Sequence, residues 1–279
     1  MRVSSTDAVS LELHDFGGYG PTLLIAHATG FCAGAYGPLA ARLAERFHVW
    51  ALDFRAHGDS TLPGGGDLTW RGMADDVLAV ADALGEGPLL AVGHSMGGAC
   101  LMGAELRAPG TLRAAYLFEP IIIPARSDAM AGGNPLANSA RRRRSGFPSR
   151  LEALGRYAGR PPLGTFRADA LSAYVEHGFA AAPDGTVTLK CSPESEAAVF
   201  EAAGKPRIDE LGAIATPVVV ACGSRDPGPG PADFAPAVAA ALPDATLLRY
   251  AHVGHFGPFQ DPDTIADDIG AAFAPFTDA

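Results

Sequence analysis

Short apolar runs of strand length alternate along the chain with longer amphipathic segments rich in alanine and leucine. This alternation is typical of parallel strands joined by crossover helices, so the sequence predicts an α/β fold. The expected strands are Ser10–Leu13, Thr22–Ala26, His48–Leu52, Leu89–Gly93, Ala114–Phe118, Pro217–Cys222 and Thr246–Tyr250. The expected helices are Gly37–Arg46, Trp70–Leu84, Met96–Arg107, Pro231–Ala241 and Pro262–Phe276.

The alternation stops between about Pro120 and Leu211, where strand-like runs are scarce. Helical stretches appear there instead, at Ser149–Tyr157 and Ala168–His177. A compact domain rarely holds so long a segment as a bare loop. We therefore predict a core domain made of residues 1–120 and 211–279. Residues 121–210 are expected to form a helical cap, or lid, inserted over the carboxyl edge of the sheet.

Composition and charge narrow the range of partners. Hydrophobic residues make up 48% of the chain and charged residues 19%, which is ordinary for a globular protein. The net charge of −10 opposes binding to nucleic acid or to an anionic membrane, so the expected partner is a small, largely neutral substrate. Residues 1–10 lack the apolar run of a secretory signal, and the chain is predicted to be cytoplasmic. The sequence predicts no oligomeric state.

The four cysteines are far apart in sequence and form no CxxC pair. Neither a zinc site nor a disulfide framework is indicated, and free buried thiols are expected. His94 has no second ligand at helical spacing, so no metal site and no cofactor are predicted. The cysteines are Cys32, Cys100, Cys191 and Cys222.

A nucleophile motif stands where an apolar strand runs directly into a helix. The junction reads Gly93-His94-Ser95-Met96-Gly97, which fits the GxSxG pattern. In such an elbow the serine occupies a strained turn, and the flanking glycines let neighbouring backbone pass without a Cβ clash. Ser95 would project its hydroxyl from a helix amino terminus, where partial positive charge favours a developing oxyanion. Ser95 is the predicted nucleophile.

A serine hydroxyl needs a base to take its proton. His255 lies just beyond the last expected strand, in a loop that can return over the carboxyl edge of the sheet. His252 is the rival base, three residues nearer the strand, but Gly254 gives the chain freedom to turn immediately before His255. We predict His255 as the general base.

The base in turn needs a carboxylate that fixes its tautomer. Asp226 follows the strand Pro217–Cys222, and the order Ser95, Asp226, His255 is the chain order expected for this arrangement. Glu119 also follows a strand and is the alternative acid. Asp226 is ranked first and Glu119 second.

In these residues the chain resembles the α/β-hydrolase superfamily, in the capped esterase, lipase and C–C hydrolase-like branch. The resemblance covers Leu23 to about Pro120 and Thr216 to the carboxyl terminus. Residues 24–31, LIAHATGF, resemble the family's His-Gly loop, and residues 53–60, DFRAHGDS, resemble its Asp-x-Arg-Gly-His-Gly-x-Ser loop. Ala28 and Ala56 replace family glycines.

The resemblance assigns further roles. It implies that the backbone N–H groups of Thr29 and Met96 form the oxyanion hole, with Gly30 or Phe31 as alternatives to Thr29. It also implies structural roles for His27 and for the loop 53–60. If the loops assemble in this way, Phe31, Tyr36 and Phe256 become walls of an apolar substrate pocket.

Two other motifs carry less weight. Residues 141–144 are four consecutive arginines, expected on a solvated face of the cap, with anionic substrate steering as the alternative. The glycines 64–66 lack the Lys-Ser or Lys-Thr of a phosphate loop and indicate a turn.

The function predicted from these residues is hydrolysis of a carboxylic ester through an acyl-enzyme. C–C bond, lactone or thioester hydrolysis and cofactor-free perhydrolysis (haloperoxidase chemistry) use the same three residue types and are the alternatives. An epoxide hydrolase or dehalogenase is disfavoured because it needs an aspartate in place of Ser95. A ligand receptor that keeps the fold without catalysis is the competing class.

Overall fold

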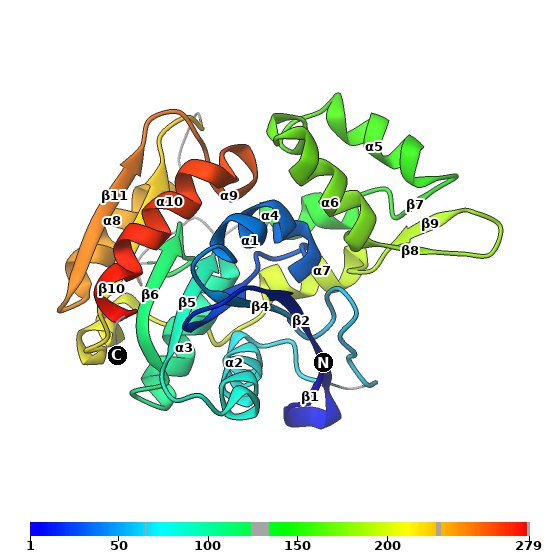
Figure 1. Cartoon of the computed structure of the whole chain (residues 1–279). Coiled ribbons are helices and arrows are strands. Elements are labelled where there is room, and N and C mark those ends of the chain that lie inside the picture. Colours follow the sequence, from blue (N-terminus) through cyan, green and yellow to red (C-terminus); the bar gives the residue numbers. More distant parts are fainter. Residues whose placement is uncertain (65, 124–133, 227–229, 278–279) are drawn as a thin grey trace.

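The computed structural model describes all residues except 65, 124–133, 227–229 and 278–279 (Figure 1). Within the described residues, eight strands form one sheet in the order β1-β2-β4-β3-β5-β6-β10-β11. Strands β4, β3, β5, β6, β10 and β11 are mutually parallel, and β1 and β2 form the antiparallel edge. The strands are β1 (Arg2–Ser4), β2 (Ser10–Gly17), β3 (Thr22–Ala26), β4 (His48–Asp53), β5 (Leu89–His94), β6 (Leu112–Phe118), β10 (Val218–Gly223) and β11 (Ala245–Tyr250).

Helices cover both faces of the sheet (Figure 1). One face packs against α1 (Gly37–Leu43) and α10 (Pro262–Phe273), with the short α9 (Gly257–Gln260) beside them. The other face packs against α2 (Trp70–Leu84), α3 (Met96–Arg107) and α8 (Pro231–Ala241). None of the helices in the described ranges has the length and apolar character that crossing a membrane requires.

Strand β3 illustrates why these runs become central strands. All five of its residues are buried, since helices lie on both sides of it. Leu23 and Ile25 belong to the core under α1 and α10, whereas Leu24 and Ala26 belong to the core under α2 and α3. Each strand expected from the sequence overlaps an observed strand, and α2, α3 and α8 have the predicted bounds. The α/β fold prediction is confirmed.

Between β6 and β10, which are neighbours in the sheet, the chain leaves the sheet and forms an insertion. Its described helices are α4 (Pro135–Arg141), α5 (Arg150–Ala158), α6 (Ala168–Gly178) and α7 (Pro193–Glu201). Helices make up a large part of the insertion, as expected. The insertion also holds a small antiparallel sheet of β7 (Gly146–Phe147), β9 (Val187–Leu189) and β8 (Phe179–Ala181). Strands of two or three residues are too short to show a periodic pattern.

Figure 1 shows α5 and the β8 and β9 hairpin at the outer edge of the molecule, away from the large sheet. The division of the chain into a core domain and a cap domain stays a prediction.

Three of the four arginines at 141–144 pair with carboxylates inside the insertion. Arg141 pairs with Glu201 on α7 at 2.6 Å, and Arg144 pairs with Glu152 on α5 at 3.2 Å. Arg143 pairs with Glu196 on α7, and the side chain of Arg143 is partly buried. Because these charges are matched inside the insertion, they give no support to steering of an anionic substrate.

The four cysteines are buried free thiols, as predicted. Burial raises the pKa of the Cys32 thiol to about 12, which leaves it protonated and unreactive at neutral pH.

Candidate active site

Ser95 occupies the sharp turn between β5 and α3. Its backbone φ is +54° and its ψ is −113°, a conformation that residues with a side chain rarely adopt. A Cβ on Gly97 would lie 2.0 Å from the carbonyl oxygen of Ala26, and one on Gly93 would lie 2.5 Å from the Cα of Gly98. Both glycines are therefore required by close backbone packing. The structure has the strand, serine and helix in the predicted arrangement.

His255 lies in the loop between β11 and α9, and its ring meets a carboxylate. His255 Nδ1 is 2.7 Å from Glu119 Oε2, and the His255 side chain is 18% exposed. The rival His252 faces elsewhere, because its Nε2 lies 2.7 Å from Asp261 at the start of α10 and its side chain is 54% exposed. Of the two candidate bases, the structure brings only His255 toward the end of β6.

Glu119 is held firmly at the end of β6. Its side chain is 1% exposed, and Oε1 accepts a hydrogen bond from the backbone N–H of Gly223 at 2.8 Å. The backbone N–H of Glu119 donates to Ala221 at 2.8 Å. Its φ is +46°, so this residue, like Ser95, holds a backbone conformation that costs free energy. Neighbouring strands fix both the backbone and the carboxylate of Glu119.

Asp226 does not contact the ring of His255. Its Oδ2 accepts a hydrogen bond from the backbone N–H of His255 at 2.6 Å, and the residue is exposed. A Cβ on Gly254 would lie 2.1 Å from Asp226 Oδ1, so the carboxylate packs against that glycine. The structure therefore corrects the expected pairing: Glu119, ranked second, lies on the ring, and Asp226 braces the loop. β6 and β10 are neighbours, so both carboxylates end near the same histidine, and chain order does not distinguish them.

Backbone hydrogen bonds place Ser95 beside the same corner. Its N–H donates to Phe118 at 2.9 Å, and its carbonyl accepts from Ile121 at 3.2 Å, so these bonds bracket Glu119. The residue before Ser95, His94, has its ring centroid 5.0 Å from that of His255. Within the described residues, Ser95 Oγ and the His255 ring form no hydrogen bond. Such bonds are often long in free enzymes and tighten when substrate binds.

A protein-family model covers most of the chain. The model of the alpha/beta hydrolase family matches residues 23–268. The chain belongs to the alpha/beta hydrolase family. This confirms the predicted superfamily and the prediction of an enzyme.

Individual curated relatives match a smaller part of the chain than the family model does. Protein phosphatase methylesterase 1 of Rattus norvegicus is 31% identical over 156 residues, covering 54% of this chain and 40% of that protein. The 2-(acetamidomethylene)succinate hydrolase of Mesorhizobium japonicum is 33% identical over 115 residues, covering 40% of this chain and 41% of that protein. The chain thus spans less than half of the length of these curated relatives. The crystal structure of E-2-(acetamidomethylene)succinate hydrolase superposes with a TM-score of 0.76 and 20% identity over 98% of both chains, which is a likeness of fold.

In this hydrolase-family chain, the loop after β3 has few N–H groups left for an oxyanion. The N–H of Ala28 donates to Tyr36 Oη at 3.1 Å, and the N–H of Phe31 donates to the Ala28 carbonyl at 3.1 Å. Phe31 is thereby removed as an alternative donor. The N–H groups of Thr29 and Gly30 have no acceptor among the described residues. Met96 is the first residue of α3, so its N–H has no acceptor within the helix.

An aromatic cluster lies beside His255, the candidate base. The ring of Phe31 is 5.8 Å from that of Phe256 and 4.9 Å from that of Phe259, and Phe166 of the insertion stacks on Phe259 at 4.7 Å. Phe31 and Phe256 are only partly buried and stay candidate pocket walls. Phe166 and Phe259 were missed, because a lone phenylalanine next to a helix reads as ordinary core.

Tyr36 was expected as a pocket wall, and this is wrong. Its side chain is 1% exposed, too little to line an accessible pocket. Its hydroxyl lies 2.7 Å from His94 Nδ1, a contact that the sequence did not predict. The sequence gives no signal for it, because the two residues are 58 positions apart.

The second family loop and His27 have the expected structural role. His27 Nδ1 lies 2.8 Å from the Ala28 carbonyl, and His27 Nε2 accepts from the N–H of Phe54 at 3.0 Å. Burial lowers the pKa of His27 to about 3, so the ring stays neutral. Ala56 has a φ of +61°, the conformation that the family glycine at this position adopts without strain.

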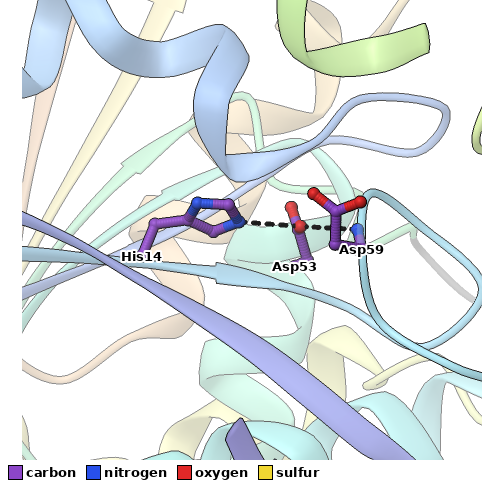
Figure 2. Close-up of side chains that lie close together, drawn as sticks. All are labelled: His14, Asp53 and Asp59. Carbon is purple, nitrogen blue, oxygen red and sulfur yellow. Dashed lines mark hydrogen bonds and ion pairs between the residues drawn. The ribbon is translucent and has the colours of Figure 1, made fainter. Parts of the chain in front are cut away.

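One cluster in the described residues has the composition of a metal site. The ligand atoms of His14, Asp53 and Asp59 lie within 4.8 Å of one another (Figure 2). Asp53 Oδ1 already accepts from the N–H of Ala33 at 2.7 Å, and Oδ2 contacts His14 Nε2 and the N–H of Asp59, both at 2.9 Å. The ammonium of Lys190 lies 2.7 Å from Asp59. The Lys190 ammonium therefore already supplies a positive charge at Asp59. The cluster fits a network of ion pairs between the core and the insertion better than it fits a metal site.

Proposed function

We propose that the chain is a serine hydrolase that cleaves a carboxylic ester, or a related acyl bond, of a small and largely uncharged molecule. Ser95 is the nucleophile, His255 the general base and Glu119 the carboxylate that orients the base. The observation that carries this proposal is the 2.7 Å contact between buried Glu119 and His255 Nδ1, next to a serine in a strained elbow.

The contact with Glu119 determines which nitrogen of His255 acts. A carboxylate accepts a hydrogen bond, so Nδ1 carries the proton and Nε2 keeps its lone pair. Nε2 is then the atom that takes the proton of the Ser95 hydroxyl. The resulting imidazolium is stabilised by the negative charge of the Glu119 carboxylate.

The reaction follows from these positions. Ser95 Oγ bonds to the carbonyl carbon as its proton passes to His255 Nε2, and the carbonyl oxygen becomes an oxyanion. The free N–H groups of Met96 and of Thr29 or Gly30 stabilise that charge. When the tetrahedral intermediate collapses, His255 gives its proton to the leaving alkoxide. Water, deprotonated by His255, then attacks the acyl-enzyme and releases the carboxylic acid and free Ser95.

The substrate class follows from the surroundings of the base. Phe31 and Phe256 offer apolar surface beside His255, which favours an uncharged acyl group. One of the relatives is named a methylesterase, which supports an ester as the scissile group. C–C bond, lactone or thioester hydrolysis and cofactor-free perhydrolysis would use the same proton transfers. No observation favours one of these reactions over ester hydrolysis.

A substrate panel tests the proposal. We expect hydrolysis of p-nitrophenyl esters in a series of rising acyl length, with slower or no reaction of lactones, thioesters and diketones run beside them. Ser95→Ala should lose at least about 10⁴-fold in kcat while remaining folded by circular dichroism. Turnover that survives in folded Ser95→Ala would contradict the proposal.

A further inference from the structure

Three hydrogen bonds, two of them buried and one partly buried, link the loop after β3 to the loop after β11 through His94, the residue before Ser95. This chain of hydrogen bonds begins at the N–H of Ala28, which lies 3.1 Å from Tyr36 Oη, and continues from Tyr36 Oη to His94 Nδ1 at 2.7 Å. His94 Nε2 then lies 2.8 Å from the carbonyl oxygen of His255. Tyr36 and His94 are each 1% exposed, so water does not compete for these bonds.

The direction of each bond is fixed by its end groups. The carbonyl of His255 only accepts, so His94 Nε2 carries a proton and donates it. Burial lowers the pKa of His94 well below its ordinary value, which keeps the ring neutral and leaves Nδ1 as an acceptor. Tyr36 therefore donates to His94 Nδ1, and its oxygen accepts from Ala28. Each of the three hydrogen bonds therefore has one direction.

We propose that Tyr36 and His94 are positioning residues. They hold the loop after β3, which contains Thr29 and Gly30, at a fixed distance from the loop after β11, which contains His255, with Ser95 between them. The inference deepens the proposed hydrolase function and rests on it. Neither residue touches the reacting atoms. Tyr36 acts through the backbone of the loop that contains Thr29 and Gly30, and His94 acts through the backbone of His255.

The sheet topology explains why such a link is needed. Ala28 follows β3, and His255 follows β11, which is four strands away in the sheet. His94 ends β5 and immediately precedes Ser95, so it lies between the two loops. An oxyanion hole and a general base work only if both are placed within a few tenths of an ångström relative to the nucleophile. The hydrogen-bonded side chains provide a direct connection that adjacent strands do not.

The first test compares two tyrosines with buried hydroxyls, of which Tyr36 makes two hydrogen bonds and Tyr116 makes one. Tyr116 Oη lies 2.7 Å from Tyr250 Oη in the same core but outside the proposed chain. Both Tyr36→Phe and Tyr116→Phe should lower the melting temperature, and Tyr36→Phe should lower it more because it removes two buried hydrogen bonds. Only Tyr36→Phe should lower kcat for p-nitrophenyl acetate, by about 10-fold to 100-fold with little change in KM. Equal kcat values in the two variants would overturn the proposal.

The second test uses His94 and a double variant. His94→Gln places an amide N–H near the position of Nε2 and should retain more of kcat than His94→Leu, which donates nothing. Because Tyr36 and His94 form one link between the two loops, the double variant Tyr36→Phe with His94→Leu should lose less activity than the two single losses combined. Additive losses, or equal kcat for His94→Gln and His94→Leu, would contradict a connected chain.

A third measurement needs no activity and separates the two proposals. Nitrogen NMR of labelled protein reads the tautomer of His94, which should be neutral with the proton on Nε2 in the wild type. In Tyr36→Phe the Nδ1 resonance should shift because its donor is lost. A proton on Nδ1, or no shift in Tyr36→Phe, would overturn the positioning role. A wild type with the expected tautomer but no turnover of any ester would instead overturn the proposed function.

Discussion

The ends of β6 and β10 present two carboxylates to one histidine loop, and the two are held in opposite ways. Glu119 is buried, has a positive φ and bonds to the ring of His255. Asp226 is exposed and bonds to the backbone N–H of the same residue. Glu119 contacts the imidazole ring that is the base in the proposed mechanism, and Asp226 contacts the backbone that carries this ring.

Glu119 is placed to orient the candidate base His255, whereas Asp226 is placed to support the loop that carries it. A carboxylate that fixes a tautomer must meet Nδ1, and it gains strength from burial because the surrounding dielectric is low. A carboxylate that accepts a backbone N–H stabilises the loop whichever nitrogen of the ring is protonated. The strained backbone of Glu119 is retained by the surrounding strands, which is common at functional sites.

The largest expected effect is that of Glu119→Gln. The amide cannot compensate an imidazolium charge and can present its NH₂ to Nδ1, which would select the wrong tautomer. We expect kcat for p-nitrophenyl acetate to fall by about 10³-fold to 10⁴-fold. Glu105→Gln is the matched control, because Glu105 is also buried and accepts from the N–H of Leu112 at 2.9 Å. A Glu119→Gln enzyme as active as Glu105→Gln would contradict the assignment.

Asp226→Asn should have a far smaller effect on turnover. An asparagine oxygen still accepts a hydrogen bond, so the backbone N–H of His255 keeps a partner and kcat should change by no more than about threefold. Asp226→Ala removes the acceptor and should lower kcat by about tenfold through misplacement of the loop. Steady-state kinetics of the two variants measures this difference. A loss in Asp226→Asn as large as that in Glu119→Gln would make Asp226 the orienting acid.

A second carboxylate and histidine pair, Asp53 and His14 (Figure 2), sharpens the comparison, because neither residue has a role in the proposed chemistry. The hydrogen bond to Asp53 raises the pKa of His14, and, against the opposing effect of burial, the same bond helps to lower the pKa of Asp53. The stabilisation from His14 is therefore fully present below the pKa of an unfolded histidine and is lost as pH rises through the folded value.

His14→Gln should accordingly reduce the free energy of unfolding by about 1 kcal/mol or less near pH 5.5, and by less near pH 9, with kcat unchanged. Urea unfolding at the two pH values measures this. A larger loss at the higher pH would show that the pair is not an ion pair of this sign.

The smallest effect concerns backbone strain. Ala56 and Glu119 both have a positive φ, but the side chain of Ala56 has no role in the proposed chemistry. Ala56→Gly should relieve the strain and raise the free energy of unfolding by about 0.5 kcal/mol, since the entropy cost of glycine offsets part of the gain. Thermal unfolding measures the change, and turnover should stay the same. A destabilised Ala56→Gly would mean that the methyl group packs usefully.

The sequence predicted the parts of the molecule that depend on local pattern. Strand β3 and helices α2, α3 and α8 follow from apolar periodicity, and Ser95 follows from the small residues that its elbow requires. The choice between Glu119 and Asp226 depends on which carboxylate reaches a ring across neighbouring strands, and no local pattern records that distance. The contact of Tyr36 with His94 and the short strands of the insertion were missed for the same reason, since tertiary packing alone creates them.

Reaction with a fluorophosphonate, followed by intact-protein mass spectrometry, tests the central claim most directly. The wild type should gain one adduct, located on Ser95, and Ser95→Ala should gain none. Glu119→Gln should react at least about 100-fold more slowly than Asp226→Asn, because the reagent measures activation of the serine by its base. A folded wild type that takes no adduct, or an Asp226→Asn variant that reacts more slowly than Glu119→Gln, would contradict the account.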